Sequence, residues 1–255
     1  MQNRYSGDIG DYSKFVLLRK LFAADSHRIG LVWYLYPDES DTNDGRHTDY
    51  LDNEAFSDCD PDLVLGLTQV ITKQRNIRTL EAAELIPNHP VYFSEPLDFH
   101  LRYPRQTTEH KRSRQEARAH WLQRALAAVS NCNVLMLDPD NGLEIRSCKK
   151  IHQARAGKYA FYHEVDHFFR DKDVCVIYQH LHRQASHPAQ MQQRAQELKQ
   201  RLPGVAQVFA IRYTPYTPRA YFLLSSSQAV KQIRNSLKQF IGSICGRGWD
   251  SVIEV

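Results

Sequence analysis

Hydrophobic and polar residues change in blocks along the chain, and the spacing within each block predicts a helix or a strand. Between residues 11 and 24, Phe15, Leu18 and Phe22 recur at helical spacing behind Asp11, which can cap the first turn. Further helices are predicted over residues 60–74, 114–130, 158–170, 188–202 and 228–245. Apolar runs predict strands at residues 28–36, 89–95, 133–138 and 173–180, and a hairpin over residues 206–226.

The order of these blocks predicts the fold class. Strands that alternate with helices form a mainly parallel sheet with helices on both faces, so we expect a Rossmann-like α/β fold that ends in an antiparallel hairpin. A chain of 255 residues suits a single domain, residues 1–255, with a helical basic insertion around residues 98–130.

Polar residues stand directly after three of the predicted strands. The stretch VLMLDPDNGLEI at residues 134–145 runs from a buried strand into two carboxylates, a carboxamide and a glycine. Ligands of open α/β sheets bind outside the carboxyl ends of the strands, so these loops should form one site. The side chains expected there are Asp41, Asn43, Asp44, Asp138, Asp140, Asn141, Glu144, Gln179 and His180.

The composition of the chain predicts where the protein is located and the state of its cysteines. No apolar run reaches the length of a membrane span, and the first residues do not resemble a secretory signal, so we predict a cytoplasmic protein with no membrane partner. Five cysteines lie far apart without a CxxC pair, which predicts reduced, buried thiols rather than a disulfide scaffold or a zinc site.

The basic segment at residues 100–124 suggests a partner. The formal charge of the chain is only +4, but seven Lys/Arg residues face two glutamates in this segment. Lys111, Arg114 and Arg118 are spaced to share one helix face, as contacts to the phosphates of RNA or DNA require. Arg183 is a further candidate for phosphate binding. The alternative is an ordinary solvated helix face, because basic helix surfaces also occur in proteins that bind no nucleic acid.

Several stretches together resemble a known family. GDIGDYSKFVLL at residues 7–18, the Asp-Pro strand end at 138–139 and the closing hairpin resemble class I S-adenosylmethionine-dependent methyltransferases. The large-subunit rRNA adenine-N6 methyltransferases are the nearest branch, since they open with an Asp-x-x-Lys-His helix and carry a DPPY motif. The stretches GDIGDY, NDG, LDPDNGLE and YQH are also similar to those of a bacterial protein family.

The resemblance implies a methyltransferase-like fold that uses S-adenosylmethionine as cofactor. Lys14 matches the lysine near the cofactor's carboxylate, and Asp11 matches the acidic residue before it. The acidic loop with Asn43, Asp44 and Gly45 takes the place of the family's glycine-rich cofactor loop.

The resemblance also implies a catalytic set. Asp138 and Pro139 match the half of DPPY that accepts hydrogen bonds from the target amine. Asp140 and Asn141 stand where the family has proline and the stacking aromatic residue. We therefore expect Asp138 and Asn141 to accept hydrogen bonds from the amine of a nucleic-acid base. The full predicted catalytic set is Asp138, Pro139, Asp140, Asn141 and His180.

Other chemistries compete with methyl transfer. Asp138, Asp140 and Glu144 offer the oxygen ligands that Mg²⁺ or Mn²⁺ prefers, so the main alternative is a metal-dependent nuclease or phosphodiesterase, for example one used in defence against phage, with His180 as general acid or base. A non-catalytic nucleic-acid-binding module is a third hypothesis. HEVDH at residues 163–167 matches HExxH, but it lacks a third histidine and lies among aromatic residues, so a zinc protease is disfavoured.

Overall fold

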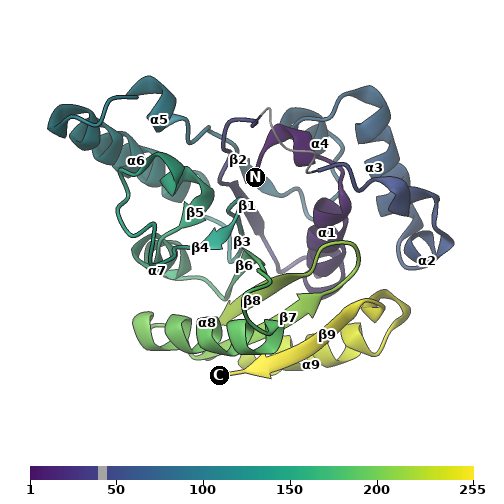
Figure 1. Ribbon diagram of the computed structural model, residues 1–255. Coiled ribbons are helices and arrows are strands. Elements are labelled where there is room, and N and C mark those ends of the chain that lie inside the picture. Colours follow the sequence, from purple (N-terminus) through teal and green to yellow (C-terminus); the bar gives the residue numbers. More distant parts are fainter. Residues whose placement is uncertain (40–44) are drawn as a thin grey trace.

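A seven-stranded sheet forms the centre of the molecule in a computed structural model that describes residues 1–39 and 45–255 (Figure 1). From one edge to the other, the strands are β2 (Val91–Phe93), β1 (Ile29–Trp33), β3 (Val134–Asp138), β6 (Val174–His180), β8 (Arg219–Ser225), β7 (Gln207–Tyr213) and β9 (Trp249–Glu254). Strands β2, β1, β3 and β6 are parallel, while β8 is antiparallel to both of its neighbours. The predicted mixed α/β fold with a mostly parallel sheet is confirmed.

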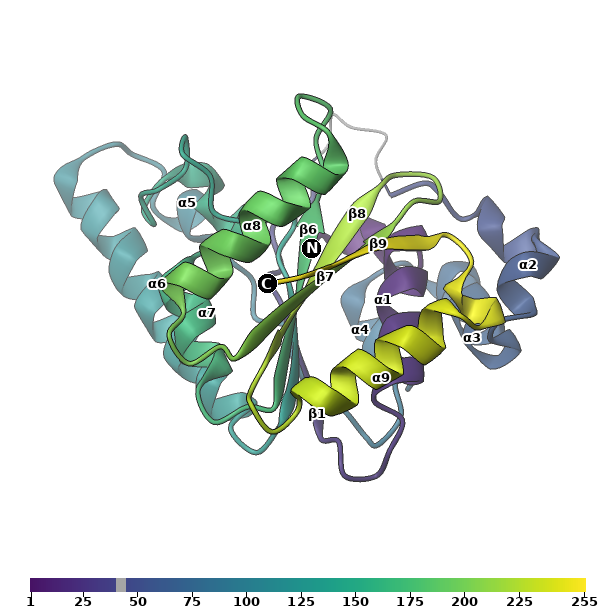
Figure 2. The same ribbon diagram turned by 90° about the horizontal axis from the view of Figure 1, so that it is seen from below.

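Helices cover both faces of this sheet (Figure 2). One face carries α1 (Ile9–Leu21), α3 (Pro61–Lys73), α4 (Ile77–Ala82) and α9 (Val230–Ile241). The other face carries α6 (Thr108–Ala128), α7 (Tyr162–Phe169) and α8 (His187–Arg201). Shorter elements are η1 (Asn3–Tyr5), η2 (Asp49–Asp52), α2 (Glu54–Ser57), α5 (Phe99–Arg102), β4 (Gly142–Leu143), η3 (Ala154–Lys158), β5 (Tyr159–Ala160) and η4 (Ile244–Gly246).

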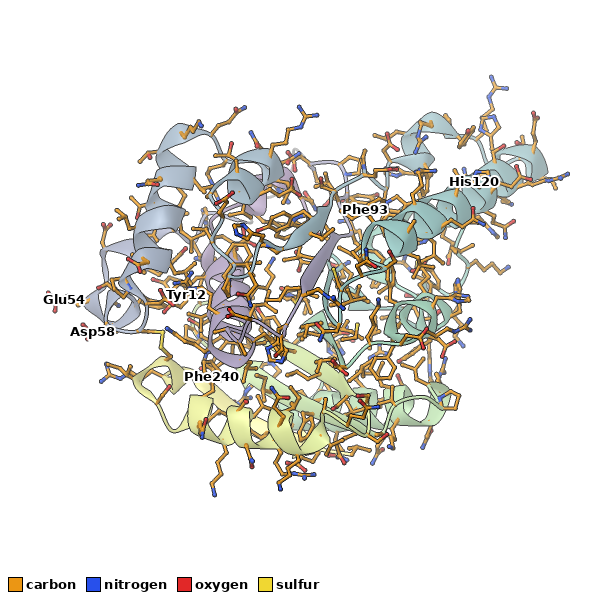
Figure 3. All side chains as sticks on the ribbon, turned by 180° about the vertical axis from the view of Figure 1, so that it is seen from behind. Tyr12, Glu54, Asp58, Phe93, His120 and Phe240 are labelled. Carbon is orange, nitrogen blue, oxygen red and sulfur yellow. A yellow bond between two sulfur atoms is a disulfide. The ribbon has the colours of Figure 1, made fainter. Side chains whose placement is uncertain are left out.

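The alternation of side chains along each strand divides the hydrophobic core into two layers. In β3, Val134 and Met136 pack with α1 and α9, whereas Leu135 and Leu137 pack with α6, α7 and α8. Successive strand residues point to opposite faces, so a strand that is apolar throughout is buried on both sides. Seen from behind, the two layers contain the labelled rings of Tyr12 and Phe93, while Glu54 and Asp58, at the two ends of α2, lie at the outer edge of the molecule (Figure 3).

Local signals account for where the helices begin. Helix α1 starts at Ile9 because the side chain of Asp8 accepts hydrogen bonds from the backbone N–H groups of Gly10 and Asp11. Asp11 was expected to be the cap, but it lies inside the helix with its side chain fully buried. Because Asp11 does not cap the helix, its carboxylate can form an ion pair inside the protein.

The carboxyl-terminal part of the chain differs from the sequence-based expectation. Strand β8 lies between β6 and β7, so the predicted hairpin is inside the sheet, and the unpredicted strand β9 covers its edge. The region predicted as helix from residue 158 starts instead with β5, which pairs with β4, and becomes helical only at Tyr162.

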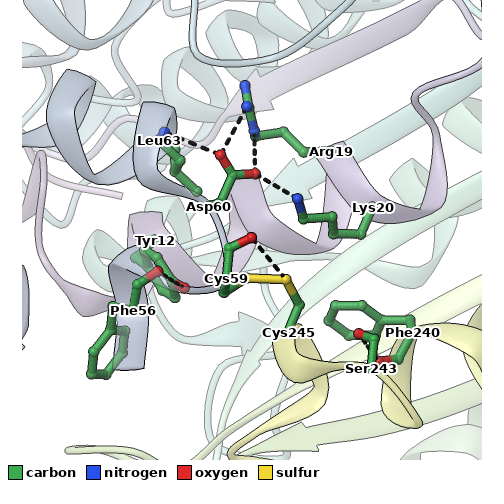
Figure 4. Close-up of a disulfide and its surroundings, with 10 residues drawn as sticks. All are labelled: Tyr12, Arg19, Lys20, Phe56, Cys59, Asp60, Leu63, Phe240, Ser243 and Cys245. Carbon is green, nitrogen blue, oxygen red and sulfur yellow. Dashed lines mark hydrogen bonds and ion pairs between the residues drawn. A yellow bond between two sulfur atoms is a disulfide. The ribbon is translucent and has the colours of Figure 1, made fainter. Parts of the chain in front are cut away.

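The cysteine prediction is wrong for one pair. Cys59, between α2 and α3, forms a disulfide with Cys245 in η4, across 186 residues of sequence (Figure 4). Spacing in the sequence cannot reveal this pair, because only packing of the helices that lead to them brings their Cα atoms to 4.7 Å. Cys132, Cys148 and Cys175 are buried free thiols, as expected. Beside the disulfide, Asp60 caps α3 and pairs with Arg19 and Lys20.

Among residues 1–39 and 45–255, no helix combines the length and the apolar composition that a membrane-crossing segment needs.

Candidate functional site

A cavity of about 240 Å³ opens at the carboxyl ends of β3 and β6. The first two turns of α1 and the start of β8 also line it, through Gly10, Lys14 and Arg219. Parallel sheets place ligands at this edge because the loops and helix N-termini meet there. The cavity therefore lies where the polar strand ends predict a site.

Lys14 joins two carboxylates at the floor of this cavity. Its Nζ lies 2.7 Å from Oδ1 of Asp11 and 2.8 Å from Oδ2 of Asp138, and all three side chains are almost fully buried. The other oxygen of Asp11 accepts a hydrogen bond of 2.8 Å from the backbone N–H of Gly7. Two motifs 124 residues apart in the sequence thus meet in one buried ion-pair network.

The electrostatics of this network follow from its composition. Burial lowers the pKa of Lys14, but Asp11 and Asp138 outweigh burial, so the pKa of the ammonium is raised above its ordinary value of 10.5. Burial raises the pKa of Asp11 to about 6, although Lys14 acts in the opposite direction. Lys14 is therefore held as a cation. Its single positive charge is shared between the carboxylates of Asp11 and Asp138, so it is not available to a further anion.

The loop after Asp138 is held by a side chain from the neighbouring strand. Gln179 of β6 accepts a hydrogen bond from the backbone N–H of Leu143 and donates to the carbonyls of Asn141 and His180. Gly142 has φ +106°, and a Cβ atom there would lie 2.5 Å from Cδ of Gln179. Glycine is required at this position both by the backbone conformation and by the close approach of Gln179.

We expect Gly142→Ala to lower the free energy of unfolding by about 1–3 kcal/mol, because alanine is strained at this φ and must displace Gln179. Urea denaturation of the purified protein measures the change. The control is Gly204→Ala, since a Cβ at Gly204 meets no atom within 4 Å; its effect should stay within about 0.5 kcal/mol. Equal losses in the two variants would contradict this account of the loop.

Asp140, two residues after Asp138, also has its charge compensated. Its Oδ2 accepts a hydrogen bond of 3.1 Å from Gln2 and lies 3.5 Å from Nζ of Lys158. The amino group of Met1 lies 3.7 Å from Oδ1. Asp138 and Asp140 therefore both have positive groups beside them: Lys14 beside Asp138, and Lys158 and the amino group of Met1 beside Asp140.

The alternative metal-ligand set is not brought together. Glu144 does not line the cavity, because its carboxylate accepts a hydrogen bond of 3.3 Å from the backbone N–H of Tyr162 at the start of α7. In the described ranges 1–39 and 45–255, no group of three or more His, Cys, Asp or Glu side chains is arranged to hold a metal ion. The geometry of Asp138, Asp140 and Glu144 gives this hypothesis no support.

Most of the residues predicted for the site line the cavity. They are Lys14, Gly45, Asp138, Pro139, Asp140, Asn141 and His180. Asp11 lies behind the cavity wall and reaches the site through Lys14. Asn43 and Asp44, predicted to hold a cofactor, and Asp41 lie outside the described residues. Gly45 has φ +80° and packs against Arg4 and Tyr5, which leave no room for a Cβ atom.

The prediction of a basic stripe on α6 is wrong. Arg114 and Arg118 are 2% and 1% exposed and cannot reach a phosphate group. Arg114 donates to the backbone carbonyls of Tyr103, Arg105 and His152. The spacing correctly placed both residues on one helix face, but that face is turned inward, and only Lys111 of the three is half-buried. His120, labelled in Figure 3, lies on the opposite, exposed surface of the same helix.

Arg118 has a structural partner in the HExxH stretch. Its guanidinium forms two hydrogen bonds with the carboxylate of Glu164, of 2.7 and 3.0 Å, and donates to the carbonyls of Ala156 and Tyr159. Glu164 is fully buried and also accepts a hydrogen bond from the N–H of Phe161 at the start of α7. The stretch therefore caps a helix and carries an internal ion pair, and the disfavoured zinc site has no geometric basis.

The lining residues that were not singled out in the sequence include Tyr5, His47, Thr217 and Arg219. Thr217 and Arg219 reach the cavity because β8 is antiparallel, so that its first residue pairs with His180, the last residue of β6. A hairpin is visible in the sequence, but its position in the sheet is not. The only available signal was a single arginine at the start of an otherwise apolar strand.

No protein-family model matches the sequence, and a search of curated proteins gives no significant match.

Proposed function

We propose that the protein is an S-adenosylmethionine-dependent methyltransferase that acts on nucleic acid. The observation that carries the proposal is the 2.8 Å contact between Lys14 and Asp138 in the cavity wall. Lys14 and Asp138 each match a functional residue of the resembled family, and the two matches lie 124 residues apart in the sequence. Because the two residues contact each other in one cavity, the matches support the same function rather than two unrelated similarities.

The cavity offers groups that fit such a cofactor and a target amine. Asp138, Asp140 and Asn141 supply acceptors for amino groups, and Tyr5 and Tyr178 supply aromatic surface for a purine ring. The cofactor would contribute an electrophilic methyl group. The role of Asp138 and Asn141 is to accept hydrogen bonds from the target amine, so that its lone pair is directed at the methyl group and its proton is drawn away.

Lys14 is a positioning residue in this proposal. Its ammonium donates to Oδ2 of Asp138 and fixes the orientation of that carboxylate at the end of β3. The family resemblance assigned Lys14 to the cofactor's carboxylate, whereas its contacts here favour a role through Asp138.

Exposed arginines near the cavity favour an anionic substrate. Arg46 follows the lining residue Gly45, and Arg183 lies on the exposed loop after β6. Cations around the entrance of a site attract the phosphates of nucleic acid and hold its backbone without reading its bases. With Arg114 and Arg118 buried, Arg46 and Arg183 are the better candidates for this contact.

The test combines binding and transfer. Calorimetry in metal-free buffer should show that the wild-type protein binds S-adenosylmethionine, and transfer of labelled methyl groups to total bacterial RNA and to DNA should follow. We expect Asp138→Asn to lower the transfer rate by a factor of about 100–1,000, because the amide cannot replace the charged acceptor. Asp62→Asn, on the exposed surface of α3, is the control and should transfer at the wild-type rate.

Two results would reject the proposal. One is the absence of S-adenosylmethionine binding by the folded wild-type protein, and the other is unchanged methyl transfer by Asp138→Asn. Mn²⁺-dependent cleavage of the same nucleic acids, lost in Asp140→Asn, would instead favour the nuclease hypothesis.

A further inference from the structure

Arg219 is a buried cation that has no acidic partner among residues 1–39 and 45–255. It is the first residue of β8, is 4% exposed and lines the cavity next to Thr217. Its Nε donates a hydrogen bond of 2.9 Å to the carbonyl of Thr217. In the part of the chain that the structure describes, no carboxylate oxygen lies within 4.0 Å of its guanidinium. The other two buried arginines there are satisfied, since Arg118 forms two hydrogen bonds with Glu164 and Arg114 donates to three backbone carbonyls.

The acidic groups around the cavity are already engaged. Asp138 is bound to Lys14, and Asp140 lies between Gln2, Lys158 and the amino group of Met1. Burial lowers the pKa of Arg219, and Tyr178, Tyr221 and Asp8 raise it. The carboxylate of Asp8 forms no ion pair with Arg219 and caps the first turn of α1. The amino group of Met1 donates to the backbone carbonyls of Tyr34 and Asp138.

The position of the guanidinium is set by its surroundings. A Cβ atom on Gly10 would lie 2.9 Å from Nη1 of Arg219, so the absence of a side chain at Gly10 allows the guanidinium to lie against α1. The guanidinium carbon also lies 5.9 Å from the ring centre of Tyr213. These neighbours and the hydrogen bond to Thr217 limit the positions that the guanidinium can take.

We infer that Arg219 is an anchor for an oxyanion of the ligand that fills this cavity. Charged side chains are almost never buried without a partner, because desolvation of the ion is costly. A planar guanidinium with free N–H donors recognises a carboxylate or a phosphate through two parallel hydrogen bonds. Lys14 cannot take this role, since its charge is shared between Asp11 and Asp138.

The identity of the oxyanion rests on the proposed function. In a methyltransferase it is either the carboxylate in the amino-acid part of the cofactor or a phosphate of the nucleic acid. Both groups can present two neighbouring oxygen atoms to a guanidinium. Binding of either group leaves Asp138 and Asn141 available for the target amine. Probes that carry only one of the two groups distinguish them.

The experiment is calorimetry of the full chain with three probes. S-adenosylhomocysteine carries the carboxylate, 5′-methylthioadenosine has the same nucleoside without it, and inorganic pyrophosphate represents the phosphates. The variants are Arg219→Gln, which removes the charge, and Arg219→Lys, which keeps the charge but not the planar fork. Arg112→Gln is the control, because Arg112 is exposed on α6 and pairs with Glu116.

We expect Arg219→Gln to weaken one probe by a factor of about 30 or more, as the loss of a charge-assisted pair of hydrogen bonds implies. Arg219→Lys should be weakened about 3- to 10-fold. If S-adenosylhomocysteine is the affected probe and 5′-methylthioadenosine is not, the oxyanion is the cofactor's carboxylate. If pyrophosphate is affected and S-adenosylhomocysteine is not, it is a phosphate. Arg112→Gln should bind every probe as the wild type does.

Wild-type affinity of Arg219→Gln for all probes would overturn the inference. It would also be overturned if the wild type bound neither S-adenosylhomocysteine nor pyrophosphate, the two probes that carry an oxyanion. If thermal melting shows that Arg219→Gln does not fold, wild-type affinity of Arg219→Lys overturns it instead. Failure of the proposed function has another signature: pyrophosphate binding that depends on Arg219, without binding of either nucleoside. That result would retain the oxyanion anchor and reject the methyltransferase.

Discussion

Replacement of Lys14 by methionine should lower the free energy of unfolding at pH 7.5 by about 3–5 kcal/mol, because it leaves the buried carboxylates of Asp11 and Asp138 without their common cation. Methionine has nearly the length of the lysine stem, so the loss reports the missing charge more than a cavity. Chemical denaturation with a circular-dichroism readout measures the change.

The loss should depend on pH in a defined direction. Because the folded-state pKa of Asp11 is raised from 3.8 to about 6, its contribution to stability is fully present below about pH 4 and is lost as the pH rises through 6. Without the Lys14 ammonium, the pKa of Asp11 rises further, because Lys14 is the group that lowers it. The difference between the variant and the wild type should therefore be smallest near pH 4–5 and increase towards neutral pH.

Lys20→Met is the matched control for Lys14→Met. Lys20 lies on the same helix and pairs with Asp60, but its side chain is 34% exposed and Arg19 binds the same carboxylate. We expect a loss of at most about 1 kcal/mol with little dependence on pH. If Lys14→Met were as mild as this control, the network around Asp138 would not be the buried cluster described above.

Replacement of Arg118 by methionine should lower the free energy of unfolding by a similar amount, about 3–5 kcal/mol. The variant leaves Glu164 buried without its cation and removes the guanidinium's hydrogen bonds to the carbonyls of Ala156 and Tyr159. Urea denaturation monitored by tryptophan fluorescence is suitable, because Trp121 lies one helical turn away on the same helix.

Two further variants make the Arg118 experiment specific. Arg112→Met, on the exposed face of α6, removes the same charge at a side chain that is 80% exposed and should change the free energy by less than about 0.5 kcal/mol. The double variant Arg118→Met with Glu164→Leu should lose less than the sum of the two single variants, because no unpaired charge remains. A strictly additive double variant would show that the ion pair itself contributes nothing.

These two experiments concern side chains whose patterns the sequence displayed but whose surroundings it did not. The helical spacing of Arg114 and Arg118 was seen correctly, yet a pattern of charges does not state which face of a helix points inward. Arginine stems carry enough carbon to lie inside a protein once the guanidinium finds acceptors, and here backbone carbonyls and Glu164 supply them. The same limit applied to HEVDH, where Glu164 was visible and its partner was not.

Many residues of the candidate site, by contrast, could be predicted from the sequence. Strand ends could be located because buried strands are apolar and the residues after them are polar, and the rule that ligands bind at the carboxyl edge then brought Asp138, Asn141 and His180 together. Lys14 was found through family resemblance. Arg219 was missed because its place depends on β8 being inserted, antiparallel, between β6 and β7.

The sequence by itself determined the local structure, the class of fold and the edge of the sheet that carries the cavity. These features depend on periodicity, capping residues and the polarity of strand ends, which are properties of neighbouring residues. Only the tertiary structure decided which charges are paired inside the protein, that Cys59 meets Cys245, and that Arg219 faces the cavity without an acidic partner among the described residues. The physical reason is that desolvation and pairing energies depend on residues brought together from distant parts of the chain.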